Sequence, residues 1–474
     1  MSEHTDKDVR LLGLIPMSWR LELTAWPTLR WLFKRRWFPM ILILFNLAIF
    51  MVILISGLMG GFSSGNYSFG IMIVWILWWV LLMMLFVPVL SRSWCLMCPL
   101  PSFGEWLQRL RIFGVNNKLG GLNLKWPRRL RNMWLMNFLF LGTTFFSGFL
   151  TVRPLATFLM LGTIIVLAIV LSLVFERRSF CLYVCPVSGF QGLYSNMAVM
   201  EIRAKDPKIC EKHKLKTCES GSKKGYGCPW QLKPHSFKRN TYCGMCLECF
   251  KTCPFDNMAL NIRPPGADLL INEKRGLDEA WKSFIMLGIA VMFYAAMMGP
   301  WGTLKDWVRA NTVREWLSFV GLHTIFNLAV IPAIFLVFVW LARLASGNRE
   351  VSLKAAFVNL SYCLIPLGLA AWIAFSFGFL LPNGSYILHI LSDPFARDWN
   401  LFGTAGFPWT PVGTGWLVSL QFVILLVGYI FSADFGYKLV AQTFADQKAA
   451  RRAFVPLLTF LTLAVIAFGW LYGG

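Results

Sequence analysis

Histidine and acidic residues are scarce in this sequence. Its 474 residues include five His and 23 Asp or Glu, against 45 Lys or Arg. Only His323 lies well inside an apolar run, so a haem held by two histidines at matching depth is not expected. We also find no pattern of acid–base or nucleophilic catalytic residues. The 12 cysteines are therefore the residues most able to bind a metal or to carry out redox chemistry.

Apolar residues dominate the composition. They make up 57% of the chain, and the mean hydropathy of +0.59 is typical of an integral membrane protein. Runs of about 20 apolar residues can cross a hydrocarbon core of about 30 Å as helices. We expect about nine spans: Trp37–Leu58, Phe69–Leu90, Asn132–Val152, Leu155–Phe175, Trp281–Thr303, Ser318–Leu341, Ala355–Leu381, Gly413–Phe431 and Ala453–Tyr472.

Basic residues are distributed unevenly between the expected loops. The first 36 residues, the loop from Arg92 to Arg131 and the middle polar interval are rich in Lys and Arg, whereas the alternate loops are poor in them. The positive-inside rule then places the amino terminus and the middle interval in the cytoplasm. The loop with Lys305, Arg309 and Arg314 departs from this pattern. The net charge of +22 thus indicates orientation rather than nucleic-acid binding, and no cleavable signal peptide is expected.

The middle interval contains the strongest motif, YCGMCLECFKTCP. Its spacing, C-x2-C-x2-C-x3-C-P, is that of bacterial [4Fe–4S] ferredoxins, in which the fourth cysteine binds the neighbouring cluster. A structural zinc site is the alternative, but it more often shows separate C-x2-C pairs. The motif predicts four cluster ligands: Cys243, Cys246, Cys249 and Cys253.

A modified partner motif precedes this run, with Cys210, His213, Cys218 and Cys228 in the four ligand positions. By the usual exchange of fourth ligands, Cys228 joins Cys243, Cys246 and Cys249, and Cys253 joins Cys210 and Cys218. The last position of the second cluster falls to His213 or to an outside ligand. His213 could equally be a solvated residue of a lysine-rich loop. The basic surface of this interval fits an acidic electron carrier or anionic lipid headgroups.

Two further cysteine pairs follow expected membrane spans. SWCLMCPLPSFGE contains Cys95 and Cys98, and SFCLYVCPVSGFQ contains Cys181 and Cys185. This recurrence is an internal repeat that could bring the four thiols together to hold another iron–sulfur centre, or the pairs could act as dithiols or simply pack. Each pair is followed by a Ser and a Glu or Gln in capping-box spacing: Ser102/Glu105 and Ser188/Gln191.

The motifs resemble the membrane polyferredoxins of the NapH/NosR type over about Trp37 to Arg263. The resemblance rests on CLYVCP, the shorter variant CLMCP and the run ending at Pro254. It implies Cys-Pro motifs at cytoplasmic membrane exits, ferredoxin-like [4Fe–4S] clusters and electron movement between the quinone pool and a partner reductase or its maturation system. Cys181 and Cys185 match the C-x3-C-P motif of the family. The first motif is one residue shorter, and the carboxyl-terminal half lies outside the pattern of the smaller relatives.

We therefore expect an all-α polytopic membrane protein with a small cytoplasmic ferredoxin-like insert that holds two [4Fe–4S] clusters. The expected parts are a basic tail (1–36), a four-helix membrane repeat (37–196), the iron–sulfur domain (197–280) and a five-helix membrane domain of unassigned role (281–474).

The expected function is electron transfer in the inner membrane of a prokaryote, between quinone and a soluble carrier or respiratory reductase subunits, as a component of an oxidoreductase. His323 is a candidate quinone contact or a packing residue. Two alternatives stay open: a copper reductase or assembly factor for a respiratory oxidase, and a redox-regulated transporter or sensor.

Overall fold

The structure is a computed structural model that describes residues 9–60, 68–112, 114–116, 120–271, 273, 275–298, 302–309, 311–444 and 446–473. The expected basic tail is therefore described from residue 9 onward. The chain forms two compact units. The first contains residues 1–51, 85–136 and 160–271, and the second contains 52–84, 137–159 and 272–474. All cysteines of the predicted motifs belong to the first unit.

Eight helices within the described ranges are long and apolar enough to span a membrane. This finding supports a mostly helical, multi-pass membrane protein. The eight helices are α2 (Trp37–Gly60), the segment Phe69–Phe86, α9 (Pro154–Val174), α15 (Leu277–Met297), Val313–Ser346, Leu353–Asn383, α22 (Thr414–Phe444) and α23 (Gln447–Gly473).

The third expected span, Asn132–Val152, is not one continuous helix in the structure. It contains α7 (Trp134–Thr144) and α8 (Ser147–Leu150), neither of which has spanning length. The Thr143 and Thr144 hydroxyls donate to the carbonyl oxygens of Phe140 and Leu141, at 2.7 and 2.6 Å. Such local side-chain bonds compete with the helical backbone pattern and favour a helix end at this point.

The span expected at Trp281–Thr303 ends earlier than predicted. Helix α15 stops at Met297, and a separate amphipathic helix, α16 (Gly302–Arg309), carries Lys305 and Arg309. The basic loop that departed from the orientation pattern is thus partly a short helix with a polar face.

Three of the spans are interrupted or widened. Phe69–Phe86 alternates α-helix with π-helix, and η8 is a π-helical segment within Val313–Ser346. Helices α19 and α20 meet at Tyr362–Cys363. The segments of these spans are α3 (Phe69–Ile71), η2 (Met72–Trp78), α4 (Trp79–Leu81), η3 (Leu82–Phe86), α17 (Val313–Ile325), η8 (Phe326–Val330), α18 (Ile331–Ser346), α19 (Leu353–Ser361) and α20 (Leu364–Asn383).

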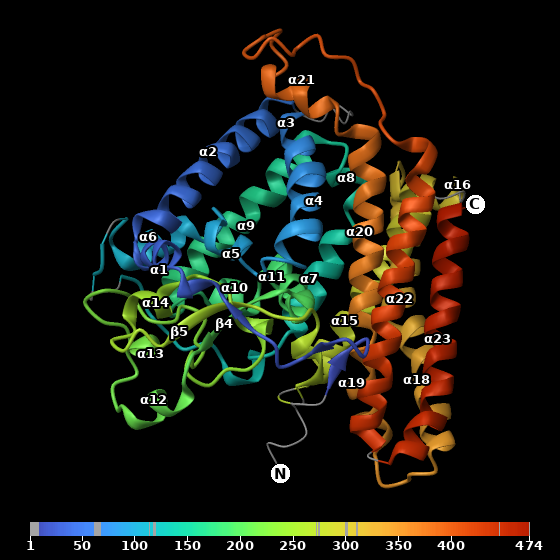
Figure 1. Cartoon of the computed structure of the whole chain (residues 1–474). Helices are drawn as coiled ribbons and strands as arrows, with labels where there is room; N and C mark the ends of the chain where they lie inside the picture. Colours follow the sequence, from blue (N-terminus) through green and yellow to red (C-terminus); the bar gives the residue numbers. More distant parts are fainter. Residues whose placement is uncertain are drawn as a thin grey trace. The chain divides into compact units, whose positions relative to one another are not determined.

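The second unit is a helical bundle. Helix α22 packs against α20 and α23, α23 packs against α18, and α15 packs against α20 (Figure 1). Small residues allow close approach: a Cβ at Gly428 of α22 would lie 2.3 Å from the Cβ of Ala370 in α20. A short helix, α21 (Tyr386–Ser392), precedes the loop that leads to α22.

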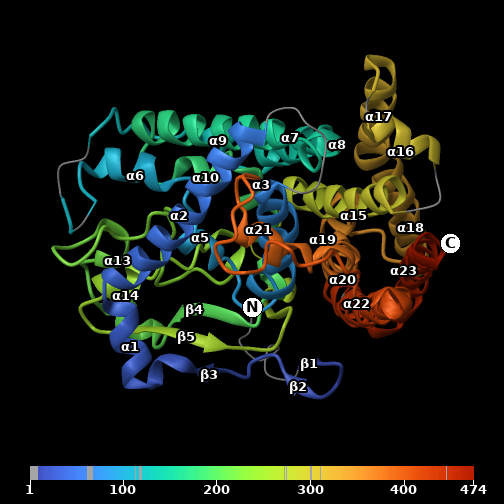
Figure 2. The ribbon, with the colours of Figure 1, turned by 90° about the horizontal axis from the view of Figure 1, so that it is seen from above.

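The first unit contains a three-stranded antiparallel sheet in the order β3–β5–β4 (Figure 2). Strand β4 (Met200–Ala204) precedes the cysteine-rich interval and β5 (Met258–Ile262) follows it, with Met200 opposite Ile262 and Ala204 opposite Met258. The amino-terminal strand β3 (Leu21–Glu22) pairs with the other edge of β5. The pairing of β4 with β5 brings the two ends of the insert together.

The remaining α-helices of the first unit are short, and all of them except α1 carry or flank the cysteines. They are α1 (Pro27–Lys34), α5 (Trp94–Met97), α6 (Ser102–Arg109), α10 (Ser179–Tyr183), α11 (Pro186–Tyr194), α12 (Pro207–Lys212), α13 (Thr217–Ser220) and α14 (Glu248–Thr252). A two-stranded hairpin, β1 (Arg10–Leu11) and β2 (Ile15–Pro16), opens the described chain.

Candidate functional site

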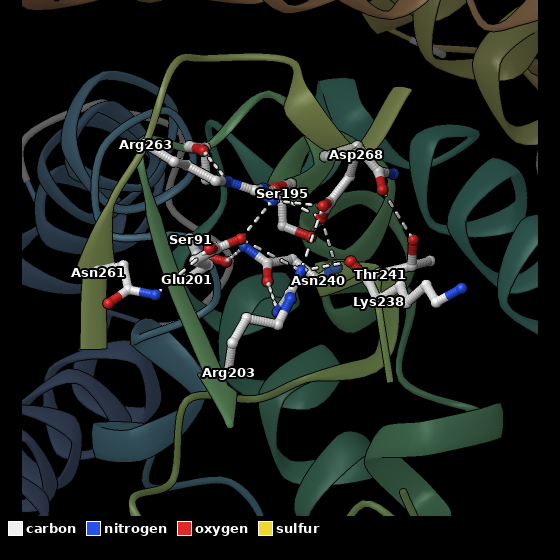
Figure 3. Close-up of polar contacts among 12 residues, drawn as sticks. Ser91, Ser195, Glu201, Arg203, Lys238, Asn240, Thr241, Asn261, Arg263 and Asp268 are labelled. Carbon is white, nitrogen blue, oxygen red and sulfur yellow. Dashed lines mark hydrogen bonds and ion pairs between the residues drawn. The ribbon is translucent and has the colours of Figure 1, made fainter. Parts of the chain in front are cut away.

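A buried charge network fixes the start of the Cys243 run (Figure 3). Arg263, which directly follows β5, pairs with Asp268 and, at 3.0 Å, with Glu201 of β4. The backbone N–H of Asn240 donates to Asp268 at 2.6 Å. Burial alone would raise the pKa of Asp268, but the Arg263 charge holds it below its usual range. The ionised network thereby ties the residues before Cys243 to the sheet.

The same segment is tied to α11 and to the single turn of 3-10 helix that follows it, η5 (Ser195–Met197). The Thr241 hydroxyl donates to the side-chain oxygen of Asn196 at 3.0 Å, and the buried Arg92 guanidinium donates to the Thr241 carbonyl at 2.5 Å. A Cβ at Gly192 would lie 2.5 Å from that carbonyl oxygen, so a larger residue would separate the two segments. The cysteine run is therefore held between the sheet and α11.

The backbone of the run turns sharply between the cysteines. Met245 and Leu247 have φ angles of 51° and 62°, a left-handed conformation that is costly for such side chains and occurs mainly at functional sites. Gly244 is required by packing, because a Cβ there would lie 2.0 Å from the indole ring of Trp230. The loop thus folds closely around its own cysteines and around Trp230.

The structure brings together Cys228, Cys243, Cys246 and Cys249, which we call the first insert set. Burial, and then the charges of Cys246, Cys243 and Cys228, raise the pKa of Cys249. Burial and Cys243 raise the pKa of Cys228 to about 11. Thiols that affect one another in this way lie close together, so this grouping matches the expected exchange of Cys228 into the downstream motif.

Cys210, Cys218 and Cys253 form the second insert set. Burial, then Glu219, Cys253 and Cys210, raise the pKa of Cys218 to about 11. Asn257 links the other two cysteines, because its backbone N–H donates to Cys253 Sγ at 3.3 Å and its side chain donates to Cys210 Sγ at 3.2 Å.

His213 lies beside the turn that follows the second insert set. Its ring is 4.8 Å from that of Phe255, two residues after Cys253. Within the described ranges, its Nδ1 is buried and has no hydrogen-bond partner. This environment differs from that of a fully solvated side chain.

The four cysteines of the Cys-Pro pairs also converge, and we call them the membrane-exit set. Burial, then Cys95 and Cys185, raise the pKa of Cys98. Burial and the neighbouring Cys185 raise the pKa of Cys181, with smaller contributions from Cys95 and Cys98. The internal repeat therefore places thiols from both motifs side by side.

The expected capping boxes after these pairs are wrong. Helix α6 has Pro101 and α11 has Cys185 at its N-cap, and neither has a side-chain cap bond. Glu105 instead forms a buried ion pair with Arg178 of the other repeat, and the Cys95 thiol lies 3.6 Å from the side-chain oxygen of Gln191. Glu105 and Gln191 hold equivalent positions in the two repeats. Each of them contacts a residue of the other repeat beside the membrane-exit set.

Arg92, Arg178 and Trp230 form a layer between the membrane-exit set and the first insert set, which we call the arginine–tryptophan layer. The two guanidinium carbons lie 4.4 and 5.9 Å from the centre of the Trp230 ring. Arg178 donates to the Cys95 carbonyl at 2.9 Å, and its charge acts on both Cys181 and Cys246.

Arg92 has the equivalent position in this layer. Its charge acts on Cys185 of the membrane-exit set and on Cys243 of the first insert set. The second insert set adjoins the first through the Cys228 N–H, which donates to the Cys218 carbonyl at 2.8 Å. The three sets therefore adjoin one another in series.

Iron–sulfur clusters are implied by these motifs, and the side chains around the cysteines fit them. Several buried nitrogen atoms in the described part of the chain have no hydrogen-bond partner: Arg92 Nε, Gln191 Nε2, Trp230 Nε1 and His213 Nδ1. Unpaired N–H groups are costly in a protein interior unless an acceptor is present, and the sulfur atoms of a cluster accept such bonds.

The described residues contain no group of three or more His, Cys, Asp or Glu side chains arranged to hold a single metal ion. The four thiolates of a cubane bind four different irons, so their sulfur atoms lie farther apart than the ligands of one ion. The lack of a single-ion site among the described residues is therefore compatible with cluster binding by the cysteine sets.

His323 lies in the second unit and contacts residues of that unit. It is fully buried, its Nε2 is 2.9 Å from the Thr144 hydroxyl, and its ring packs against Phe319 and Phe145. These contacts describe a packed histidine, and its expected quinone contact stays a prediction.

Arg92, Arg178 and Trp230 were not among the predicted site residues. The sequence did contain a signal, because the repeat extends upstream of the cysteines as Arg92-Ser-Trp-Cys and Arg178-Ser-Phe-Cys. Trp230 directly follows Cys228-Pro229. Aligning the two motifs over a longer window would have marked both arginines.

Comparisons with known proteins also indicate iron–sulfur binding. Residues 71–119 and 157–205 match the model of a 4Fe-4S binding domain. Each matched segment contains one Cys-Pro pair, so the repeat inferred from the motifs corresponds to two copies of this domain model. The Cys243 run lies outside both segments.

The chain is also similar to YccM of Escherichia coli (strain K12), which is named as a putative electron transport protein. The two are 23% identical over 254 residues, which represent 47% of this chain and 66% of that relative, slightly less than two thirds of its length. No solved structure matches. These findings confirm the resemblance to 4Fe–4S membrane proteins of the polyferredoxin type.

Proposed function

We propose that this protein is a membrane-bound iron–sulfur electron-transfer protein that connects the quinone pool to a respiratory partner. The observation that carries the proposal is the series of three cysteine sets, with the buried arginine–tryptophan layer between the membrane-exit set and the first insert set. A single structural cluster would need only one cysteine set. The 4Fe-4S domain matches and the name of the YccM relative support the iron–sulfur electron-transfer part of this proposal.

The first insert set supplies four cysteines for one [4Fe–4S] cluster. The second insert set supplies three for another, with His213 as the proposed fourth ligand, and the membrane-exit set supplies four for a further iron–sulfur centre. When bound, such clusters accept and donate single electrons. The residues of this chain hold the sulfur ligands, exclude water and place positive charge between the sets, which favours the reduced state of the adjoining clusters.

The proposed location is the inner membrane of a prokaryote, with the cysteine sets and the amino terminus in the cytoplasm. The distribution of Lys and Arg between loops supports this orientation. Exposed basic residues of the insert would then favour an acidic soluble electron carrier.

Low-temperature EPR combined with iron and sulfide quantitation tests the proposal. The anaerobically purified full chain should contain acid-labile sulfide and, after dithionite reduction, should show interacting S = 1/2 signals. A quinone analogue or an oxidised carrier should remove those signals. Protein that contains tetrahedral zinc and no iron would overturn the proposal.

A further inference from the structure

The first unit contains a cavity of about 390 Å³ whose lining includes Cys246. The start of α2, helix α6, the loop around Tyr226 and helix α14 line it. The volume falls within the range of small-molecule sites, roughly 300 to 1,000 Å³. Its lining shares Glu105, Arg178 and Cys246 with the sites described above, but no preceding assignment fills the space itself.

The α2 side of the cavity is apolar and adjoins the outer surface of a candidate membrane span. Ile41 and Leu44 line the cavity and are 56% and 42% exposed. Trp37, which also lines it, is 46% exposed at the first residue of α2, a position typical of the membrane interface. A molecule dissolved in the membrane could therefore reach the cavity along α2.

The opposite side of the cavity is polar and mainly basic. The guanidinium carbons of Arg36 and Arg109 lie 5.3 and 4.2 Å from the centre of the Tyr226 ring. Two buried carboxylates, Glu105 and Glu248, complete this side. The basic lining residues outnumber the acidic ones: Arg36, Arg109, Arg111, Arg178 and Lys251.

We propose that this cavity binds the head group of a membrane-soluble quinone, with its apolar tail along α2. This inference rests on the proposed function. An amphipathic ligand explains why one side is apolar and faces outward while the other is polar, and a redox-active ligand explains why a cluster cysteine forms part of the wall. An anionic phospholipid would match the first two features but not the third.

The redox reaction balances with the centres already proposed. Oxidation of one quinol gives one quinone, two protons and two electrons, and the electrons pass singly to two iron–sulfur centres. The reverse reaction consumes the same numbers. Arg109 pairs with Glu105 at 3.3 Å and Lys251 with Glu248 at 2.8 Å. The remaining N–H groups of these cations can donate to a quinone oxygen, and the remaining lone pairs of the carboxylates can accept from a quinol hydroxyl.

Photolabelling with an azido-quinone tests the site in full-length protein reconstituted in lipid nanodiscs. Mass spectrometry should locate the label on peptides that contain residues 36–44 or 105–114, and excess decylubiquinone should prevent labelling. The Ile41→Trp variant, which fills the mouth of the cavity, should reduce labelling at least about fivefold, because a ligand head group tolerates little loss of space.

The Phe45→Trp variant is the matched control. Phe45 lies on the same helix, is 64% exposed and does not line the cavity, so its labelling should stay within about twofold of the wild type. Equal loss in both variants, or label only on peptides of other regions, would overturn the proposal. Displacement of the label by phosphatidylglycerol or cardiolipin but not by decylubiquinone would also overturn it and identify a phospholipid site.

Iron, sulfide and EPR measurements on the same samples separate the two proposals. Wild-type and variant proteins should contain equal amounts of iron. If the wild type lacks iron and sulfide, the proposed electron-transfer function fails. If iron is present and the label does not map to the cavity, only the quinone site fails.

Discussion

Both Cys-Pro repeats place an arginine three residues before the first cysteine, but the two arginines meet different partners. Arg178 forms a buried ion pair with Glu105. Arg92 binds the Thr241 carbonyl and the Ser188 hydroxyl, and among the described residues it forms no ion pair. The residue of the second repeat that corresponds to Glu105 is Gln191, which is neutral.

This difference leaves one uncompensated positive charge beside two cysteine sets. A buried unpaired arginine is costly in an empty protein, but anionic clusters would compensate its charge. The cysteine pairs, which both repeats share, thus position the ligands. Glu105 and Gln191, at which the repeats differ, determine the local charge. Substitutions at equivalent positions should therefore give equal results for ligands and unequal results for charges.

Loss of a ligand should have the largest effect. Cys98→Ser and Cys185→Ser come from different repeats, and each should remove the same EPR signal and about four irons per chain, because both serve one centre. Iron quantitation and EPR check this expectation. Cys363→Ser, a buried cysteine of the second unit, is the control and should retain the full iron content. Unchanged iron in Cys98→Ser would show that the membrane-exit set holds no centre.

Removal of the Glu105 charge should have the next largest effect. Glu105→Gln leaves Arg178 buried without its carboxylate, which should destabilise the protein by about 3–5 kcal/mol. Gln191→Met changes the corresponding residue of the second repeat without affecting an ion pair, and should cost about 1 kcal/mol. Denaturant unfolding in detergent compares the two variants. Equal losses would contradict the charge asymmetry.

Addition of a charge at Gln191 should change a redox property more than stability. Gln191→Glu would place a carboxylate beside Cys95 and should lower the midpoint potential of the membrane-exit centre by on the order of 100 mV, because negative charge disfavours added electrons. An EPR-monitored redox titration measures this shift. Signals of the two insert clusters provide the internal reference, and a shift of all signals by the same amount would argue against a local effect.

A fall in pH should change the stability contributed by the two repeats differently, because Glu105 titrates and Gln191 does not. This is the smallest of the effects that we expect. Burial alone raises the pKa of Glu105, but the Arg178 and Arg109 charges hold it below the usual value of 4.5. Its ion pair therefore contributes stability above about pH 4.5, and this contribution is lost as the pH falls through the lower pKa of the folded state.

Thermal unfolding of the metal-free protein between pH 7 and pH 3 measures this loss. The wild type should lose more stability than Glu105→Gln, whose amide does not titrate. The same pH dependence in both proteins would assign the effect to other carboxylates, such as Glu201 and Asp268.

Composition was enough to predict the membrane character, whereas the grouping of the insert cysteines as cluster ligands stays a prediction from their spacing. The exchange of Cys228 and Cys253 between motifs follows from ferredoxin spacing, and the structure places these residues accordingly. Eight helices of spanning length agree with most of the expected runs. Hydropathy could not reveal the break within Asn132–Val152, because Thr143 and Thr144 act through specific hydrogen bonds.

The capping-box prediction failed for a different reason. Ser102 and Glu105 have the correct spacing, but a partner 73 residues away in sequence binds the carboxylate. A charged partner in a buried site outweighs a local cap worth about 1 kcal/mol. Contacts between repeats of this kind depend on tertiary structure, so a single sequence indicates their existence only through matching residues such as Arg92 and Arg178.

The order of strands in the small sheet has a consequence for biosynthesis. Strand β5 lies between β3 and β4 but is synthesised last of the three. At typical translation rates, β3 leaves the ribosome on the order of tens of seconds before β5. In roughly the last several seconds of this interval, after β4 and while the insert cysteines leave the ribosome, the edges of β3 and β4 have no strand between them. Cluster insertion before β5 arrives would thus occur in an open loop, so the timing of iron delivery relative to translation should affect the yield of mature protein.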